Sequence, residues 1–294
     1  MTLYSFIEVE KAHWPVRELC RTLEVSRSAW YEWRDRRASI EGHEDTLLKV
    51  HIKAIHRQSR GSYGRPRMHA ELLAEGFQVG EHRVGRLMAD LGISGLPRRR
   101  GPRTTTSDEQ APIAENILNR QFTVDRPNQA WVGDITYLRT QKGWVYLSVL
   151  IDLFSRKVVG WAMADHMETS LCLRALEKAI VLRQPPRGLI HHTDRGSQYT
   201  SRAYRSALSA AGMTVSMSRK GNCWDNAVSE SFFGTVEQEL VRNGTDWQDL
   251  RGAEKSVGDF IHSYYNGWRR HSANGYKSPC AFETLHRNGL PHAE

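Results

Sequence analysis

The sequence lacks the features of membrane-spanning, secreted and disulfide-bonded proteins. No apolar run approaches the length of a membrane span, and Glu8, Glu10 and Lys11 interrupt any apolar stretch that could serve as a signal peptide. Cysteine is scarce, and no Cys-x-x-Cys pair is formed by the four that occur, Cys20, Cys172, Cys223 and Cys280. We therefore expect a cytoplasmic protein without a membrane partner, with ordinary buried thiols and no structural zinc site.

The composition is that of a globular protein with a basic surplus. Of its 294 residues, 39% are hydrophobic and 25% are charged, which is enough for one large domain and one or two small ones. The net charge is +8, and residues 1–110 (19 basic, 15 acidic) and residues 111–294 (22 basic, 18 acidic) each contribute +4. This even surplus suits a polyanionic partner such as nucleic acid but does not by itself establish one.

Residues 1–40 are predicted to form a first helix-turn-helix segment. Apolar residues at helical spacing occupy about residues 8–37, and Ser26 follows a short turn as the expected N-cap of a second helix. Two helices joined in this way are typical of DNA-binding motifs. A helical hairpin with a solvated, arginine-rich face would give the same pattern.

Residues 41–96 are predicted to form a second helical domain. We expect a helix from Glu44 to about Arg57, a break at the segment GSYGRPR, a second helix, and a third that ends at Gly92. This is again a helix-turn-helix order, and Arg83 and Arg86 on the exposed side of the third helix are candidate DNA contacts. A purely structural helical domain is the alternative.

Residues 97–120 have the composition of a basic linker, rich in arginine, glycine, proline and threonine. Arginines in such a segment can follow a phosphate backbone through salt-sensitive contacts, although a solvated linker has the same composition. The candidate DNA-binding residues of the linker are Arg98, Arg99, Arg100 and Arg103.

Residues 121–294 have the pattern of an α/β domain with a helical C-terminal extension. The segment QAWVGDITYL is predicted to be a strand, and a strand hairpin follows with its turn near residues 155–157. An amphipathic helix, a short buried strand, a helix, a strand and a further helix come next. This order predicts a mixed five-stranded sheet covered by helices.

Three carboxylates in this domain occupy positions that favour metal binding. Asp134 lies in the middle of an otherwise apolar strand, where a buried carboxylate is costly unless it is paired or metal-bound. Asp194 follows the short apolar strand, and Glu230 lies in the first turn of a helix, where its charge is favoured. Hard oxygen ligands suit Mg²⁺ or Mn²⁺, and two such ions can align the attacking and leaving oxygens of a phosphodiester. We therefore predict a catalytic site in which these three residues bind two Mg²⁺ or Mn²⁺ ions.

The same region resembles the DDE catalytic core of retroviral integrases and bacterial transposases. Several members of that superfamily have 35 residues between the second catalytic Asp and the Glu, and 35 residues separate Asp194 from Glu230. The strings WVGDITYL, HHTDRGSQYTS, GNCWDNAVSESFF and YYNGWRRHSANGYKSPCAFE resemble more closely the OrfB transposase of two-frame insertion sequences. The segments FIEVEKAHWPVRELCRTLEVSRSAWYEW and GSYGRPRMHAELL resemble its N-terminal part, so the resemblance covers nearly the whole chain.

This resemblance implies a ribonuclease-H-like integrase core preceded by helix-turn-helix segments. It implies a DNA transposase that cuts insertion-sequence ends with water and joins the freed 3′-hydroxyl to target DNA, without a covalent protein–DNA intermediate. It also implies a homo-oligomer on DNA, the upstream OrfA product as fusion or partner, and a location at the bacterial nucleoid.

One position departs from the family pattern. Members usually carry Lys or Arg seven residues after the catalytic Glu, whereas this chain has Glu237, on the same helical face as Glu230 and about two turns along. Because an acid there repels phosphate, either Arg219, Lys220 or Arg242 supplies the contact to the transposon end, or end binding is weak. In the alternative, Glu237 pairs with Arg242 and never meets DNA.

Several other side chains are open to two interpretations. His191 and His192 precede the second catalytic Asp, but we expect them to be packed or solvent-facing rather than to act on water. Trp131 and Trp144 are expected in the core. Trp224 is suited equally to packing and to stacking on an unpaired base.

A basic patch near the C-terminus contains Arg269 and Arg270, followed by His271. We predict that it contacts the DNA backbone, with a solvated turn as the alternative.

Two rival functions are compatible with the sequence. A DNA-binding regulator with a degenerate core is mildly favoured by Glu237 but opposed by the intact set of Asp134, Asp194 and Glu230. A metal-dependent nuclease without strand transfer would need the same three carboxylates.

Overall fold

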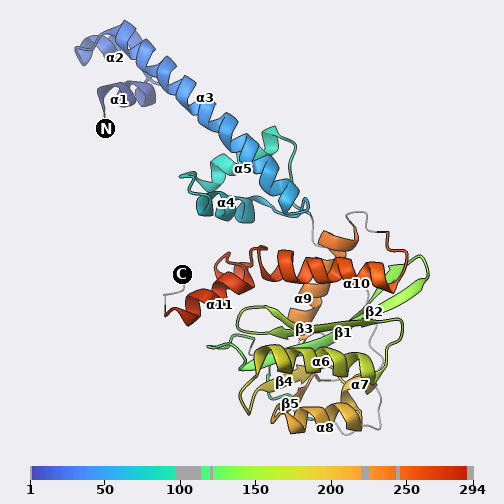
Figure 1. Cartoon of the computed structure of the whole chain (residues 1–294). Coiled ribbons are helices and arrows are strands. Elements are labelled where there is room, and N and C mark those ends of the chain that lie inside the picture. Colours follow the sequence, from blue (N-terminus) through green and yellow to red (C-terminus); the bar gives the residue numbers. More distant parts are fainter. Residues whose placement is uncertain (1, 97–113, 120–121, 220–225, 243–245, 290–294) are drawn as a thin grey trace. The chain divides into compact units, whose positions relative to one another are not determined.

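The computed structural model describes residues 2–96, 114–119, 122–219, 226–242 and 246–289 (Figure 1). The chain divides into two compact units. The helical unit comprises residues 1–58 and 63–95, and the α/β unit comprises residues 59–62 and 96–294. No helix within the described ranges is both long and apolar enough to cross a membrane.

The helical unit begins with three helices around a small apolar cluster. These helices are α1 (Leu3–Glu10), α2 (Val16–Thr22) and α3 (Arg27–Gln58). Ile7, Cys20 and Trp30 form the centre of the cluster. The expected cap of the last helix is confirmed, because the Ser26 Oγ accepts a hydrogen bond from the Ala29 backbone nitrogen at 3.3 Å.

Helix α3 is longer than the sequence pattern predicted. We expected one helix to end near residue 37 and another to begin at Glu44, but a single helix of 32 residues spans both. That prediction was wrong because the intervening residues contain only one strong helix breaker, Gly42. A glycine in a helix interior costs only about 1 kcal/mol relative to alanine, which is too little to end a helix that packs against others.

The second half of the helical unit matches the predicted order of helices. Helix α4 (Arg65–Ala74) follows the break, and α5 (Glu81–Asp90) follows a turn bounded by Gly76 and Gly80. Gly92 has a φ of +65°, the left-handed conformation expected of a glycine that ends a helix. Val84, Leu87 and Met88 are the buried residues of α5. They lie on one side of the helix and leave Arg86 on the other.

A mixed five-stranded sheet forms the centre of the α/β unit, as the sequence predicted. The strand order is β3-β2-β1-β4-β5. The pairs β1–β2 and β2–β3 are antiparallel, whereas β1–β4 and β4–β5 are parallel. The strands are β1 (Ala130–Thr140), β2 (Gly143–Asp152), β3 (Val158–Ala164), β4 (Ile190–Thr193) and β5 (Thr214–Met217).

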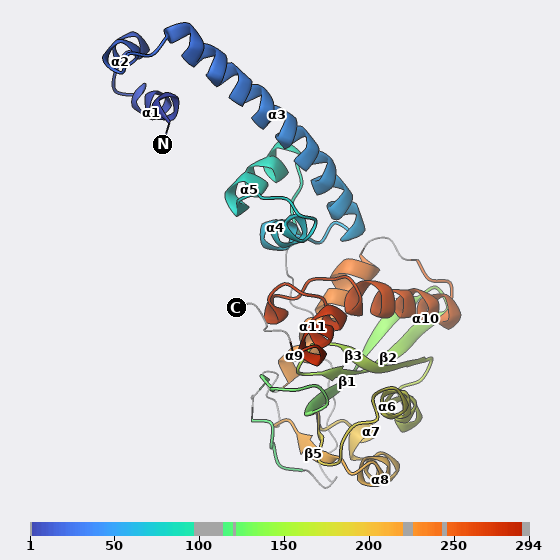
Figure 2. The same ribbon diagram turned by 60° about the vertical axis from the view of Figure 1, so that its left-hand side comes forward.

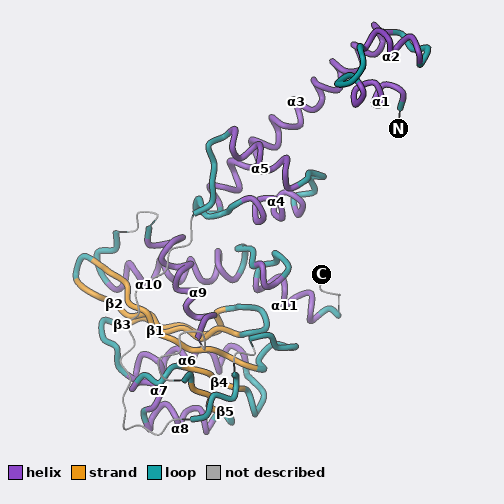
Figure 3. The backbone as a smooth tube through the Cα atoms, turned by 180° about the vertical axis from the view of Figure 1, so that it is seen from behind, coloured by secondary structure: helices purple, strands orange, loops and turns teal. Residues whose placement is uncertain are grey.

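Helices cover both faces of this sheet (Figures 1 and 2). On one face, the apolar cluster joins the sheet to α6 (Thr169–Arg183), α7 (Ser197–Thr200) and α8 (Arg202–Ala210). Gly160 lets α6 approach closely, because a Cβ at that position would lie 2.3 Å from the carbonyl oxygen of Ala175. On the other face, the cluster joins it to α9 (Ala227–Val236), α10 (Leu250–Asp259) and the π-helical segments Glu237–Val241 and Phe260–Asn266. The view from behind shows the strands between these two layers (Figure 3).

Two tryptophans predicted to be core residues have different environments. Trp131 is fully buried in β1. Trp144 is 48% exposed, so the prediction for this residue was wrong. Its ring contacts Tyr137 edge-on, and the guanidinium of Arg139 lies 5.0 Å from its centroid. Residues of the antiparallel strand pair therefore cover one side of an aromatic ring that remains at the surface.

Buried ion pairs attach the C-terminal helix α11 (Pro279–Arg287) to the α/β unit. Arg183 at the end of α6 contacts both Asp152 at 3.1 Å and Glu283 at 2.8 Å. Lys157 also bonds to Glu283, at 3.1 Å. Two basic and two acidic side chains thus attach α11 to the end of α6 and to the β2–β3 connection.

Candidate active site

The sheet register brings two of the predicted catalytic residues to the same level. Strands β1 and β4 pair in parallel, with Val132 opposite His192 as the last aligned pair. Continuing this register by two residues brings Asp134 level with Asp194, which directly follows β4. Neighbouring strands lie about 4.8 Å apart. The two carboxylates therefore start from adjacent backbone positions at the end of a short strand.

Glycine at position 133 makes room for the residues that support this arrangement. A Cβ there would lie 3.1 Å from the His191 Cε1 and 3.2 Å from the Thr193 Cγ2. The β4 side chains thus pack directly against the β1 backbone, one residue before Asp134.

Both carboxylate oxygens of Asp134 accept hydrogen bonds. The Ile135 backbone nitrogen donates to Oδ1 at 2.8 Å, and the Asn226 Nδ2 donates to Oδ2 at 2.7 Å. Burial raises the pKa of Asp134 well above its usual range, and the charges of Asp194 and Glu230 raise it further, against the lowering effect of the Ile135 N–H. The charges of the other two predicted carboxylates thus both act on Asp134.

Asp194 and Glu230 reach the site from different elements. The Gly196 backbone nitrogen donates to the Asp194 Oδ1 at 2.9 Å, which fixes this carboxylate in the turn that ends β4. Glu230 lies in the first turn of α9 and is exposed. Its position beside the helix N-terminus favours the ionised form.

The donor set fits a hard divalent cation, although the present geometry does not enclose one. Three carboxylates are the ligand type that Mg²⁺ and Mn²⁺ prefer, and the mutual repulsion of these three is what a cation relieves. Within the described residues, however, no group of three His, Cys, Asp or Glu side chains is arranged so that it could hold a metal ion. That these three carboxylates bind a shared cation therefore stays a prediction.

The two histidines before Asp194 are packed residues, as expected. The His191 Nε2 lies 2.9 Å from the Tyr204 hydroxyl, and burial lowers the pKa of His191 to about 3. The His192 nitrogens lie 2.8 Å from the Ser216 Oγ and 3.1 Å from the Ser218 Oγ. Because both rings are buried and bonded to hydroxyls, they connect β4 to its neighbours and do not face a substrate.

Asn226 is a residue of the site that the sequence reasoning missed. No role was predicted for it from the sequence, although it directly precedes the helix that carries Glu230. A signal was nevertheless available, because an asparagine four residues before the catalytic Glu lies about one helical turn from it, on the same side.

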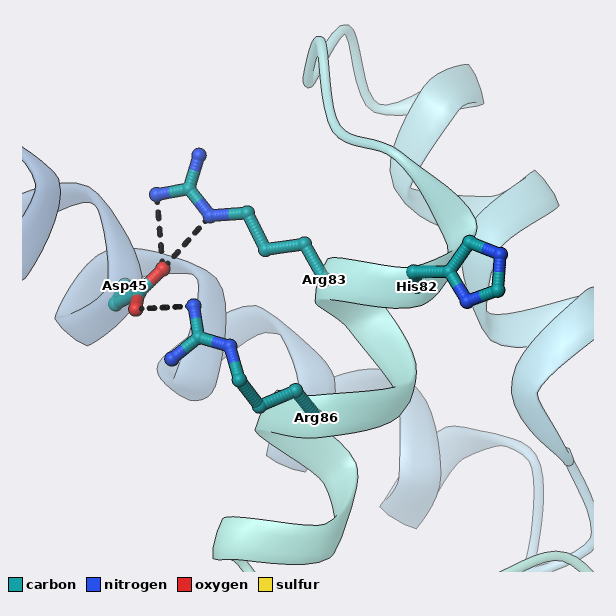
Figure 4. A pocket seen from close by; sticks show the side chains of 4 residues that line it. All are labelled: Asp45, His82, Arg83 and Arg86. Atoms are coloured by element: carbon teal, nitrogen blue, oxygen red, sulfur yellow. Dashed lines mark hydrogen bonds and ion pairs between the residues drawn. The ribbon is translucent and has the colours of Figure 1, made fainter. Parts of the chain in front are cut away.

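A second candidate site is the predicted DNA-contacting surface on α5. Arg83 contacts Asp45 at 2.8 Å and Glu44 at 3.2 Å, and Arg86 contacts Asp45 at 3.0 Å. Figure 4 shows both guanidinium groups directed at Asp45 on α3, while His82, which lines the same pocket, points away. Arg86 has the more accessible side chain, 58% exposed against 28% for Arg83. Arg83 is therefore held by two acids, whereas Arg86 keeps more of its surface for a ligand.

The remaining basic candidates fall into three groups. Arg219 is exposed and donates to the Asn119 Oδ1 at 3.3 Å, and Arg270 is half-buried and donates to the Tyr276 carbonyl at 2.8 Å. Arg269 is only 5% exposed, and its guanidinium donates to both carboxylate oxygens of Glu239, at 2.7 and 2.8 Å. This burial argues against the DNA contact expected of Arg269. Five further candidates lie outside the described residues: Arg98, Arg99, Arg100, Arg103 and Lys220.

The unusual acid Glu237 has a local partner. It is the first residue of the π-helical segment that continues α9, and the Arg242 Nε lies 3.4 Å from its Oε1. Both side chains are about half exposed, at 50% and 46%. The alternative in which these two residues pair is thus the arrangement present in the structure.

Comparison with known families identifies both parts of the chain. A family model described as "Integrase core domain" matches residues 124–223, and another with the same description matches residues 211–279. A model described as "HTH-like domain" matches residues 42–101. Together these matches include the residues of the α/β site and helix α5.

Relatives of known description match almost the whole chain. "Transposase InsF for insertion sequence IS3A" of Escherichia coli K12 is 39% identical over 284 residues, covering 95% of this chain and 98% of that protein. "Insertion element IS600 uncharacterized 31 kDa protein" of Shigella sonnei is 40% identical over 264 residues, covering 90% and 97%. Among solved structures, the HTLV-2 integrase catalytic core domain in complex with magnesium is 20% identical with a TM-score of 0.44, covering 54% of this chain and 97% of that chain.

Proposed function

This chain belongs to the family of transposases of IS3-type insertion sequences and is a DNA transposase with an integrase core; from that premise we propose how its residues divide the reaction. Asp134, Asp194 and Glu230 form the catalytic centre. The observation that carries this assignment is the parallel register of β1 and β4, which sets Asp134 level with Asp194. The HTH-like part binds DNA and the α/β part cuts and joins it.

The proposed reaction consists of two phosphoryl transfers on insertion-sequence DNA. In the first, a water oxygen bonds to phosphorus at the element's end, and the 3′ oxygen leaves as a free hydroxyl. In the second, that 3′-hydroxyl oxygen bonds to a phosphorus of the target strand, whose own 3′ oxygen leaves. Each step forms one P–O bond and breaks one, so no external energy source is required.

Enzymes of this kind depend on metal ions, and we assign the ions Mg²⁺ or Mn²⁺, two in number, to the three carboxylates. When bound, the ions lower the pKa of an attacking water or hydroxyl and stabilise the leaving oxygen. The chain's own contribution is to hold the ligands. The Ile135 N–H and the Gly196 N–H fix Asp134 and Asp194, and we assign Glu230, exposed at the start of α9, as the third ligand.

DNA binding is assigned to basic side chains of both units. On α5, Arg86 contacts DNA while Arg83 supports it through Asp45. Arg219, Arg270 and the arginines of residues 97–103 contact the phosphate backbone. We further propose that the protein acts as a homo-oligomer on paired DNA ends, with the OrfA product as fusion or partner. Such a protein works in the bacterial cytoplasm at the nucleoid.

A strand-transfer assay tests the assignment of the catalytic centre. DNA carrying the element's ends is incubated with the full-length protein, with and without OrfA, in Mg²⁺, Mn²⁺, Ca²⁺ or chelator. We expect cleavage and joining only in Mg²⁺ or Mn²⁺, because the larger Ca²⁺ distorts the near-octahedral coordination. Asp194→Asn should abolish both steps and spare DNA binding. Asp165→Asn, which changes an exposed carboxylate just after β3, should change neither; cleavage by the Asp194→Asn protein would refute the assignment.

A further inference from the structure

Asn226 occupies the N-cap position of α9 but does not cap the helix. Asparagine is favoured at this position because its side-chain oxygen accepts a hydrogen bond from a backbone N–H of the first turn. In α9 no such bond is formed by the side chain of Asn226. The amide group instead donates through Nδ2 to the Asp134 Oδ2 at 2.7 Å. The side chain is therefore committed to the catalytic strand and not to its own helix.

The oxygen of the same amide accepts no hydrogen bond from the residues that the structure describes. Asn226 is 7% exposed, and its Oδ1 is buried with no hydrogen-bond partner in the described part of the chain. Leaving a buried acceptor unsatisfied is costly and is uncommon in folded proteins. An acceptor in this position calls for a ligand with positive charge or a free O–H.

The surroundings of Asn226 identify the kind of ligand. Its Nδ2 lies 2.7 Å from the Oδ2 of Asp134, one of the three carboxylates assigned above to the metal ions. A cation held by that carboxylate would therefore lie beside the amide of Asn226. Side-chain amide oxygens are ordinary ligands of hard divalent cations, and they also accept hydrogen bonds from the water molecules that Mg²⁺ retains.

We propose that Asn226 belongs to the cation site: its Nδ2 orients the Asp134 carboxylate and its Oδ1 binds the hydrated divalent ion. The inference rests on the proposed function, since it needs an ion at the three carboxylates. It adds a fourth, uncharged oxygen to that site, from the residue that begins the helix of Glu230.

Mn²⁺ binding to the full-length protein without DNA tests this role. Free Mn²⁺ is followed by electron paramagnetic resonance during titration, and the fold of each variant is checked by circular dichroism. Asn226→Ala should weaken Mn²⁺ binding about tenfold, the lower end of the effect of removing groups that support metal ligands. Asn226→Asp should bind Mn²⁺ at least as tightly as the unchanged protein, because a carboxylate oxygen replaces the amide oxygen. Ser231→Ala, which changes an exposed residue of the helix that Asn226 precedes, is the matched control and should change nothing.

The outcomes separate this inference from the proposed function. If Asp134→Asn leaves Mn²⁺ binding unchanged, the carboxylate site itself is wrong. If Asp134→Asn weakens binding and Asn226→Ala does not, only the role of Asn226 is overturned. If Asn226→Asp weakens binding as much as Asn226→Ala, the residue serves only as an N–H donor, and the assignment of Oδ1 fails. Should Asn226→Ala not fold, the near-isosteric Asn226→Leu takes its place under the same criteria.

Discussion

One continuous helical run carries two acidic residues in opposite electrostatic situations. Glu239, in the π-helical segment after α9, is 4% exposed and receives two hydrogen bonds from Arg269 and one from the Tyr264 hydroxyl at 2.8 Å. Glu230, at the start of α9, is exposed and adds its charge to those of Asp134 and Asp194. The protein thus pairs Glu239 with an arginine, whereas the charge of Glu230 adds to those of two other carboxylates.

The comparison teaches how to tell a structural acid from a functional one in this fold. Around Glu239 and Glu283, a buried negative charge has a positive partner from the same chain. A buried pair of this kind fixes geometry and needs nothing from outside. Around Asp134, the carboxylates of Asp194 and Glu230 add charge of the same sign, and we propose that a cation from solution completes this site. The following experiments test this distinction.

The largest effect is expected from removing one carboxylate of the catalytic site. Asp134→Asn should lower the cleavage rate at least ~10³-fold, since metal-bound transition-state charge accounts for several kcal/mol and each 1.36 kcal/mol is tenfold. The same change should leave the metal-free protein as stable as before, or more stable, because it removes repulsion. Cleavage rates and urea unfolding measure the two effects. A strongly destabilised Asp134→Asn protein would place this residue with the structural acids.

Breaking the buried ion pair of Glu239 and Arg269 should, in contrast, lower the stability of the protein. Arg269→Met leaves Glu239 buried without its charge partner and should lower the free energy of unfolding by about 3–5 kcal/mol. Combining it with Glu239→Leu should restore most of that loss, because two apolar side chains then replace the pair. Urea unfolding of the unchanged protein, the two single variants and the double variant gives the double-mutant cycle for this pair. A loss below ~1 kcal/mol for Arg269→Met would mean that the pair is not a helix anchor.

A third test uses the pH dependence of the pair that holds the C-terminal helix. Burial tends to raise the pKa of Glu283, but its bonds to Arg183 and the charges of Arg183 and Lys157 lower it below 4.5 overall. A lowered pKa means that the stabilisation is present above the unfolded value and is lost as the pH falls through the folded value. Glu283→Gln should therefore cost about 2–3 kcal/mol at pH 7 and flatten the loss of stability on acidification. If the free energy of unfolding falls equally steeply with decreasing pH in both proteins, this account is contradicted.

The smallest effect is expected at the exposed pair of Glu237 and Arg242. Because both side chains are about half exposed, Glu237→Lys should change the free energy of unfolding by less than ~1 kcal/mol. It should tighten binding to end DNA and steepen the log–log salt dependence by about one unit or less. Glu177→Lys, the same charge change on the exposed side of α6, is the control. Equal effects of the two variants on DNA binding would show that only net charge matters.

The sequence predicted those parts of the fold that depend on local pattern. Asp134 and Asp194 could be proposed from the sequence because one lies within an apolar strand and the other directly follows one. Asn226 and Arg269 could not, because their roles depend on contacts with Asp134 and Glu239, 92 and 30 residues away. The prediction wrongly divided helix α3 near Gly42, whereas the packing of the helix against others outweighs the cost of one glycine. The sequence shows that Arg269 is charged but not that it is buried, so it could not be told apart from a surface arginine.

The central claim is that Asp134, Asp194 and Glu230 form a site that an external cation completes. Crystals of the full-length protein soaked in Mn²⁺ allow the ion to be located by anomalous scattering, independently of activity. The account predicts Mn²⁺ peaks bound by the carboxylates of Asp134 and Asp194, with Glu230 turned toward them, and no such peak in the Asp134→Asn protein. Mn²⁺ bound only at another acidic position, such as Glu44 and Asp45 on α3, with these carboxylates left unliganded, would contradict it.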